Sequence, residues 1–243
     1  EVLYPNPGYP IYESQINYQG GVPIPYNYVD NQNGFVIDIE KLKSSISKKT
    51  KAIIYNNYQN PTGASSSIAE IEAIANICID NDLWVLSDEA YYEIRYSHKP
   101  PISIASFPGM KERTVILYTF SKRFAMTGWR VGASIGPKKI VKHIAKLNIN
   151  DESCTNHFIQ CALASVMDKV DDDAKSILNK LKVRRDICVK LLNSIRGLSL
   201  LTPDSTFYLY LNVGELMENK NIKDLEKFRT NALKNTGVSF CTR

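Results

Sequence analysis

Residues 119–132 read TFSKRFAMTGWRVG and bring three cations together, Lys122, Arg123 and Arg130, where an apolar run ends. Because like charges repel, three cations this close need either open solvent or a strong anion nearby. A threonine and a serine come just before the lysine, and hydroxyls can donate hydrogen bonds to an anion. This stretch alone leaves solvent and a bound anion both open, so the surrounding sequence has to decide.

Short apolar runs alternate with amphipathic ones around this stretch. Ile, Ala and Cys residues between 68 and 78 recur at spacings of three and four, which predicts a helix, and Ser67 and Glu70 match the capping-box spacing at its start. The runs typical of strands are EVLYP (1–5), KAIIYN (51–56), LWVLS (83–87), TVILYTF (114–120) and RVGASIG (130–136). The alternation predicts an α/β fold with a mostly parallel sheet covered by helices on both faces.

The texture of the sequence changes after about residue 170. Residues 170–197 read as one long helix, with acids at 171–173 near its start, Gly197 at its stop and an apolar stripe that includes Leu181, Leu191 and Ile195. The segments expected after it are strands in LSLL (198–201) and FYLYLNV (207–213), a helix near 223–235 and a strand in GVSF (237–240). We therefore predict a large domain over 1–169 and, over 170–243, an interdomain helix followed by part of a smaller α+β domain.

Composition and charge exclude several classes of protein. The 243 residues are 44% hydrophobic and 23% charged, and the net charge is +5. Lys and Arg residues are interleaved with Asp and Glu and form no single basic block, so neither nucleic acid nor a membrane is expected as a partner. Five cysteines without metal or CxxC spacing favour reduced thiols in a cytoplasmic protein. His98, His143 and His157 show no metal-ligand spacing either. The chain lacks an initial Met and has strand-like sequence at both ends, so we expect a fragment that lacks N-terminal and C-terminal segments.

Four polar groups of residues follow predicted strands, where ligands of open α/β sheets gather. They are PNPGYP (5–10) with Tyr9, NPTG (60–63) with Asn60, SDEAYYE (87–93) with Asp88 and Tyr91, and the opening stretch with Thr119, Ser121, Lys122 and Arg130. Each has a plainer interpretation alone: a common turn, a helix cap, an aromatic core residue or a surface lysine. Their occurrence together, in this order and each at a strand end, favours a binding site.

These motifs resemble those of the aspartate-aminotransferase family, the class I/II pyridoxal-phosphate enzymes of fold type I. The resemblance runs through essentially the whole chain and is most specific in PNPGYP, NPTG, DEAYYE and SKRFAMTGWRVG (121–132). It implies a seven-stranded large domain, pyridoxal 5'-phosphate as cofactor, a homodimer, and transfer of an amino group between an amino acid and a 2-oxo acid. The anion that the three cations require would then be the cofactor phosphate.

The resemblance implies a role for each residue of the opening stretch. Lys122 would form the internal aldimine with the cofactor aldehyde and later move the substrate Cα proton, which requires a neutral amine. Arg130 would grip the phosphate, with Thr119 and Ser121 as hydroxyl donors. The family often has serine at the position of Thr119, and either hydroxyl could donate. No family role falls to Arg123, for which we expect solvent or a subunit contact.

The other three groups would hold the cofactor ring. Asp88 would pair with the pyridine nitrogen and keep the ring protonated, so that the ring accepts the electrons of the carbanion. Tyr91 and Asn60 would hydrogen-bond the phenolic oxygen, and Tyr9 would stack on the ring. The resemblance therefore predicts Lys122, Asp88 and Tyr91 as catalytic residues and no metal ligand.

Three alternatives for the function stay open at this stage. The leading one is an aminotransferase that takes nitrogen from aspartate or a similar amino acid and passes it to 2-oxoglutarate. The second is another enzyme of the same fold type, a carbon–sulfur lyase or a synthase, because the motifs fix the cofactor and not the fate of the carbanion. The third is an aminotransferase-like regulatory domain that binds the cofactor without catalysis. Family members also carry a phosphate-binding turn and a carboxylate-binding arginine that this chain lacks, and apolar surface is expected where such parts would pack.

Overall fold

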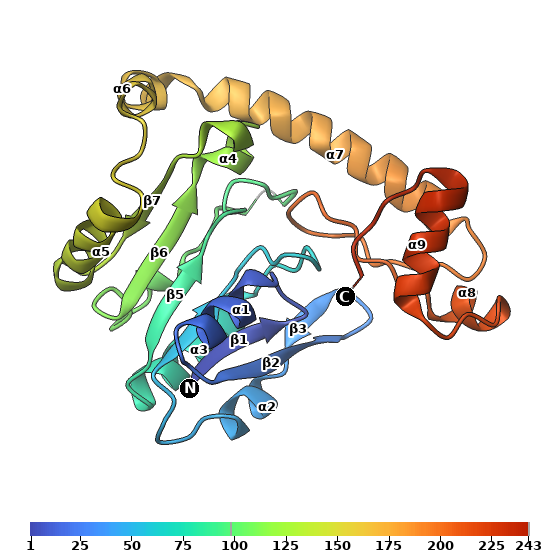
Figure 1. The fold of residues 1–243 in the computed structure, drawn as a ribbon, viewed down its shortest axis with the longest axis horizontal. Coiled ribbons are helices and arrows are strands. Elements are labelled where there is room, and N and C mark those ends of the chain that lie inside the picture. The colour runs from blue at the N-terminus through green and yellow to red at the C-terminus, as the bar shows by residue number, and fades with distance from the viewer. Residues whose placement is uncertain (98, 243) are drawn as a thin grey trace.

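A seven-stranded sheet forms the centre of the computed structural model, which describes residues 1–97 and 99–242. The strands are β1 (Val2–Asn6), β2 (Pro23–Asp30), β3 (Phe35–Ile37), β4 (Ala52–Tyr55), β5 (Trp84–Asp88), β6 (Thr114–Thr119) and β7 (Gly132–Ile135). Their order across the sheet is β3-β2-β1-β4-β5-β6-β7 (Figure 1). The four central pairings are parallel and the two outermost, β2–β3 and β6–β7, are antiparallel, which confirms a mostly parallel sheet. All five predicted strands before residue 137 are present.

Helices connect and cover these strands. The α-helices are α1 (Ile11–Tyr18), α2 (Ile39–Ser44), α3 (Ile68–Asp80), α4 (Phe120–Arg123), α5 (Lys138–Asp151), α6 (His157–Val166), α7 (Asp171–Asn193), α8 (Gly214–Asn219) and α9 (Leu225–Thr236). Three short 3₁₀ helices, η1 (Ile104–Ser106), η2 (Thr127–Trp129) and η3 (Met167–Lys169), lie between them. Only α4 and η2 separate β6 from β7, so no long crossover helix joins these two strands and they pair antiparallel.

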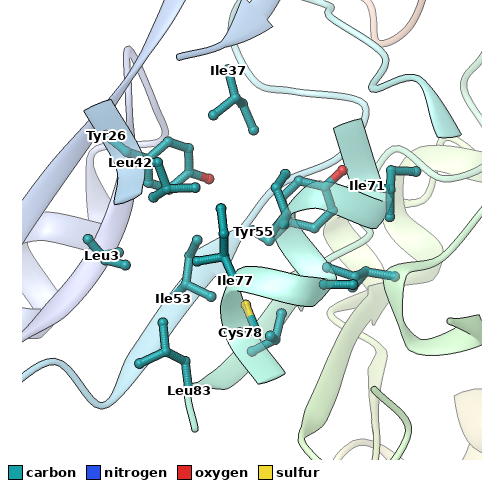
Figure 2. Packing of buried hydrophobic residues seen from close by; sticks show 14 of the residues in the cluster. Leu3, Tyr26, Ile37, Leu42, Ile53, Tyr55, Ile71, Ile77, Cys78 and Leu83 are labelled. Carbon is teal, nitrogen blue, oxygen red and sulfur yellow. The ribbon is translucent and has the colours of Figure 1, made fainter. Parts of the chain in front are cut away.

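Successive side chains of the central strands point to opposite faces of the sheet and so pack in two separate cores. Ile53 and Tyr55 of β4 point into the large core against α2 and α3, whereas Ile54 between them packs with α1 on the other face. Figure 2 shows the large core, where Leu3, Tyr26, Leu42, Ile71 and Cys78 meet around β4. The middle of the sheet is therefore covered on both faces, as predicted.

The start of α3 joins this core to the sheet edge. Ser67 accepts a hydrogen bond from the backbone N–H of Glu70 at 3.1 Å, which confirms the predicted cap. The Glu70 carboxylate in turn accepts the backbone N–H of Ile37 in β3 at 2.6 Å. Burial raises the pKa of Glu70, and the hydrogen bonds that its carboxylate accepts, first among them the one from Ile37, oppose that rise. The acid thus ties the antiparallel edge strand to a helix of the core.

The predictions for the C-terminal part are partly wrong. Helix α7 begins at the three aspartates as expected, but it ends at Asn193, before Gly197. The strands predicted in 198–201, 207–213 and 237–240 do not form; an isolated bridge joins Ser199 and Asn212. Residues 204–206, just before the second of these segments, make backbone hydrogen bonds to Gly63 and to residues 94–96, and Ser205 forms an isolated bridge with Arg95. Helix α9 is confirmed, while the domain boundary near 170 stays a prediction.

Helix α7 contacts the rest of the chain through part of its predicted stripe. Figure 1 shows it as a long helix leading from α6 to the C-terminal helices. Leu181 packs beside Tyr58, Tyr91 and Ile94, whereas Leu191 is 59% exposed and does not enter a core. The helix therefore packs apolar side chains against the protein near its middle, and Asp171 at its start is paired with Arg123 of α4.

Apolar side chains are also exposed around β7, α5 and α6. Ile135, Leu147 and Phe158 are each more than half exposed, in agreement with the expected apolar surface.

None of the described helices has both the length and the apolar character needed to cross a membrane.

Two isoleucines of α3 allow a matched test of the core. Ile74 is fully buried and Ile68 is 61% exposed on the same helix. We expect Ile74→Ala to lower the free energy of unfolding by about 2–5 kcal/mol, because it removes buried methyl groups and leaves a cavity. Ile68→Ala is the control and should cost less than about 1 kcal/mol. Urea unfolding followed by circular dichroism measures both, and equal losses would contradict this assignment of the helix faces.

Candidate active site

One cavity of about 330 Å³ lies at the carboxyl ends of the central strands. Its lining includes all eight residues singled out in the sequence: Tyr9, Asn60, Asp88, Tyr91, Thr119, Ser121, Lys122 and Arg130. They follow β1, β4, β5 and β6, which end at the same edge because they are parallel. Asn56, Ala90, Leu117, Tyr118 and Tyr208 complete the lining, and the sequence had not pointed to them. The geometry brings the predicted residues together, and their chemical roles stay predictions.

Asp88 is the acid of this cavity and is partly buried. Its Oδ2 accepts a hydrogen bond from the hydroxyl of Tyr12 at 2.5 Å, and its Oδ1 accepts the backbone N–H of Ala90 at 3.1 Å. Burial raises the pKa of Asp88, while the Tyr12 hydroxyl, the Ala90 N–H and the positive charge of Lys122 act in the opposite direction. The site therefore holds a carboxylate at the end of β5 with few groups to stabilise its charge.

Lys122 lies on the single turn of α4, directly after β6. Its Nζ is 5.8 Å from the centre of the Tyr91 ring and 5.9 Å from that of Phe207. Thr119 caps the turn, because its Oγ1 accepts the backbone N–H of Ser121 at 3.2 Å. The cap fixes the turn that directs Lys122 toward the cavity.

Arg130 and Arg123 have different surroundings. Arg130 ends η2 in the left-handed conformation, with φ of 53°, and its Nη1 donates to the carbonyl of Thr127 at 2.9 Å. The Arg123 side chain is only 16% exposed, lies 3.6 Å from the Glu93 carboxylate and hydrogen-bonds Asp171 at the start of α7. The expectation that Arg123 faces solvent was therefore wrong, because its side chain is largely buried and paired with two acids, while the alternative of a subunit contact stays a prediction. Lys122 and Arg130 are the cations of the stretch that line the cavity.

Three residues expected at a phosphate stand at the junction of two cavities. Thr119, Ser121 and Arg130 also line a neighbouring space of about 470 Å³ between β6, β7 and α5. Ser121 is buried and Arg130 is exposed. A cation and two hydroxyls at one place form a donor set suited to an anion with several oxygens.

Buried amides hold the turns that carry Tyr9 and Asn60. The Gln59 side chain, fully buried, donates to the carbonyl of Pro7 at 2.6 Å and accepts the Thr62 hydroxyl at 2.6 Å. Asn56 accepts the backbone N–H of Asn60 at 2.9 Å and donates to the backbone carbonyl of Asp88 at 2.9 Å. The turns after β1, β4 and β5 are thus joined by direct hydrogen bonds, which keeps their side chains at fixed relative positions.

The C-terminal part closes one side of the cavity. Tyr91 donates to the hydroxyl of Tyr208 at 3.0 Å, and the ring of Phe207 meets the Tyr91 ring at 5.4 Å. Burial is the main reason why the pKa of Tyr91 is raised above the usual tyrosine range, and the Tyr208 bond adds to it. The neutral Tyr91 hydroxyl is therefore a hydrogen-bond donor, and Tyr208 is its partner in this structure.

Metal chemistry has no support in the described part of the chain. Within residues 1–97 and 99–242 there is no group of three or more His, Cys, Asp or Glu placed to hold a metal ion. His143 and His157 lie on α5 and α6, and His98 lies outside the described residues.

The chain is similar in sequence to known aminotransferases. The family model "Aminotransferase class I and II" matches residues 1–239. The chain is 32% identical over 231 residues to aspartate aminotransferase of Bacillus subtilis, covering 94% of this chain and 58% of that relative. It is 34% identical over 215 residues to arginine–pyruvate transaminase AruH of Pseudomonas aeruginosa, covering 88% of this chain and 54% of that relative.

A solved structure shows the same architecture. N-succinyldiaminopimelate aminotransferase of Mycobacterium tuberculosis superposes with a TM-score of 0.91 at 28% identity, covering 100% of this chain and 63% of that one. Two features define the class of protein: a parallel sheet covered by helices, and a cavity at its carboxyl edge that is lined by a lysine and an aspartate. The chain belongs to the class I and II aminotransferases, whose cofactor is pyridoxal phosphate. It spans less than two thirds of the length of these relatives.

The residues of the cavity fit this cofactor. Asp88 offers a partly buried carboxylate for a protonated pyridine nitrogen, Lys122 a primary amine for an aldehyde, and Tyr9 an aromatic ring that is 40% exposed. Arg130 with its two neighbouring hydroxyl residues offers donors for a phosphate. The donor types therefore match the ring nitrogen, the aldehyde, the ring face and the phosphate.

Gly63 allows a test of how the C-terminal part is attached. Its φ is +71°, and a Cβ there would lie 2.4 Å from Cβ of Pro203 and 2.9 Å from the carbonyl of Ser205. Gly20 has a similar φ of +76° with nothing within 4 Å of its Cβ position. We expect Gly20→Ala to cost about 1–2 kcal/mol for its backbone conformation. Gly63→Ala should cost clearly more and loosen residues 203–213.

Urea unfolding and limited proteolysis between residues 203 and 213 measure the two effects. Equal stability and equal cleavage rates for the two variants would show that Gly63 does not hold the segment.

Proposed function

We propose that the protein is a pyridoxal-phosphate-dependent aminotransferase that moves an amino group between aspartate or a similar amino acid and a 2-oxo acid such as 2-oxoglutarate. The observation that carries the proposal is the cavity in which Lys122, Asp88 and Arg130 stand together. An amine, an acid and an anion-binding cation are the groups that this chemistry needs at one place. Membership of the aminotransferase family supports the reaction class.

Lys122 and Asp88 would carry the proton transfers. When bound, pyridoxal phosphate supplies an electron sink for the electron pair left at the substrate Cα. The Lys122 amine would bind the cofactor through its aldehyde carbon and later take the proton from the substrate Cα. The Asp88 carboxylate would hold a proton on the pyridine nitrogen, and its ionised form is needed for that.

The other residues would bind and orient. Arg130, Thr119 and Ser121 would hold the phosphate, and Tyr9 would lie against the ring. Tyr91 donates its proton to Tyr208 in the structure and could donate it to the phenolic oxygen instead, together with Asn60. Asn60 would also reach a substrate carboxylate, which its position in the lining of the same cavity supports.

The proposal also covers the amino acid that donates the amino group and the oligomeric state. The relatives act, by their names, on aspartate and on arginine with pyruvate, so the family alone leaves the donor open. We propose aspartate or a similar donor and a homodimer that completes the site. Both the donor and the homodimer are proposed for the whole protein and not for this chain alone.

An assay of two products tests the reaction class. The protein with added cofactor receives aspartate and 2-oxoglutarate, and separately cysteine alone. We expect glutamate from the first mixture. We expect neither pyruvate nor ammonia from the second, because an aminotransferase passes the amine to a 2-oxo acid and does not release it as ammonia. Release of pyruvate and ammonia without glutamate would replace the proposal with a carbon–sulfur lyase. Cofactor binding without either product would indicate the regulatory alternative.

A lysine variant tests the nucleophile. After incubation with pyridoxal phosphate and reduction with borohydride, the unchanged protein should carry one reduced adduct, on Lys122. Lys122→Ala should lose that adduct while keeping its circular dichroism spectrum, because the side chain lines a cavity and not a core. Lys43→Ala, which removes an exposed lysine paired with Glu40, is the control and should keep the adduct. Peptide mapping by mass spectrometry measures it, and an adduct that survives in Lys122→Ala rules out this lysine.

A further inference from the structure

Tyr12 lies behind the cavity and makes a short contact with its acid. The tyrosine is on α1 and only 7% exposed, and its hydroxyl donates to Asp88 Oδ2 at 2.5 Å. It is not among the residues that line the cavity. The contact joins the first helix of the chain to the end of β5, across a separation of 76 residues.

We propose that Tyr12 is a positioning residue that holds Asp88 ionised and in place to pair with the pyridine nitrogen of the cofactor. The inference rests on the proposed function, because Asp88 needs a charge only if it faces a protonated ring nitrogen. The evidence is the direction of the hydrogen bond, the burial of Tyr12 beside the partly buried Asp88, and the small number of other groups that donate to the carboxylate.

The direction of the bond follows from the charges around Tyr12. Burial is the main cause that raises the pKa of Tyr12 well above its ordinary value, and the Asp88 charge adds to the rise. The phenol therefore keeps its proton and donates it to the carboxylate. A hydrogen bond to a charged acceptor is worth more than a neutral one, so the bond favours the ionised form of Asp88.

Few other groups stabilise that charge. Lys122 on α4 and the Ala90 N–H favour the carboxylate, while burial opposes it. Tyr91 and Glu89, on the turn after β5, and Arg130 across the cavity are the other titratable groups nearby. The Glu89 carboxylate accepts hydrogen bonds from Ser87 and Ser103, so it offers Asp88 no donor. Tyr12 is thus the one side-chain hydroxyl bonded to Asp88 among the described residues.

Packing does not explain why this residue carries a hydroxyl. The ring of Tyr12 lies with Ile16 and Ile54 in the small core under α1, where phenylalanine would pack equally well. The same ring meets Tyr9 edge to face, with centres 5.7 Å apart and planes at 82°. Tyr12 therefore supports two residues at once, the acid through its hydroxyl and the stacking ring through its edge.

Titration of Asp88 in Tyr12→Phe tests the proposal. Carbon-13 NMR of labelled aspartate carboxyls, with Asp88→Asn to assign the signal, follows the midpoint in the full chain. Losing a donor to the charged form should raise the midpoint by about one to two pH units. Tyr4→Phe is the matched control, because Tyr4 packs in the same small core and does not contact Asp88. A midpoint equal in Tyr12→Phe and Tyr4→Phe would overturn the proposal.

Cofactor binding gives a second readout with a defined sign. Affinity for pyridoxal phosphate should fall as pH falls through the Asp88 midpoint, because protonation removes the charge that faces the ring nitrogen. In Tyr12→Phe this fall should begin about one to two pH units higher. In an Asp88→Asn background, Tyr12→Phe should cause no further loss, since its effect passes through the acid. An equal loss in both backgrounds would show that Tyr12 acts through packing alone.

The outcome is separable from that of the proposed function. If no Lys122 adduct forms, the proposed function fails, while the carboxyl titration still tests the effect of Tyr12 on Asp88. If the adduct forms and the midpoint does not move, only the role of Tyr12 fails. Should Tyr12→Phe not fold, the unchanged chain with carbon-13 at the tyrosine Cζ serves instead. One tyrosine signal must then titrate with the Asp88 midpoint, and its absence would overturn the proposal.

Discussion

The central parallel strands are buried on both faces, and the site depends on this constraint. Neighbouring side chains of β4 enter different cores, so a slip by one residue would move each set into the core of the opposite face, whose packing it does not fit. Parallel strands held in register must also end at one edge, which places the turns after β1, β4, β5 and β6 side by side. The cavity at this edge is thus a consequence of how the sheet is buried.

Charge is the second constraint, since the edge carries both an acid and cations in a partly buried place. Arg123 is neutralised by Glu93 and Asp171 and serves to join α4 to α7. Lys122 and Arg130 are left to the cavity, with Asp88 as its acid. An isolated buried carboxylate would take up a proton, so the donors around Asp88 decide whether the acid can serve as a counter-ion. Tyr12 belongs to the fold and to the chemistry for this reason.

Local patterns in the sequence predicted the parts of the site that local chemistry determines. Strand-forming runs, the cap at Ser67 and the polar turns after each strand are set by neighbours within a few residues, and these predictions were confirmed. Tyr12 and Tyr208 were missed because their partners lie 76 and 117 residues away, and no short pattern encodes such contacts. The spacing of three residues between Tyr9 and Tyr12 on one turn was the available signal.

The strand predicted in FYLYLNV was wrong for a related reason, and the error shows how the two sides of the site differ. The composition of that segment favours a strand, yet Asn212 forms just an isolated bridge with Ser199, and the preceding residues 204–206 are held by backbone hydrogen bonds to Gly63 and to residues 94–96. The wall formed by Phe207 and Tyr208 is therefore held by loop contacts, whereas Asp88 and Lys122 are held by the sheet. A substitution at the wall can reshape the cavity around a substrate without moving the acid or the amine. The groups proposed for the cofactor and those that would contact a substrate side chain can thus change independently in this fold.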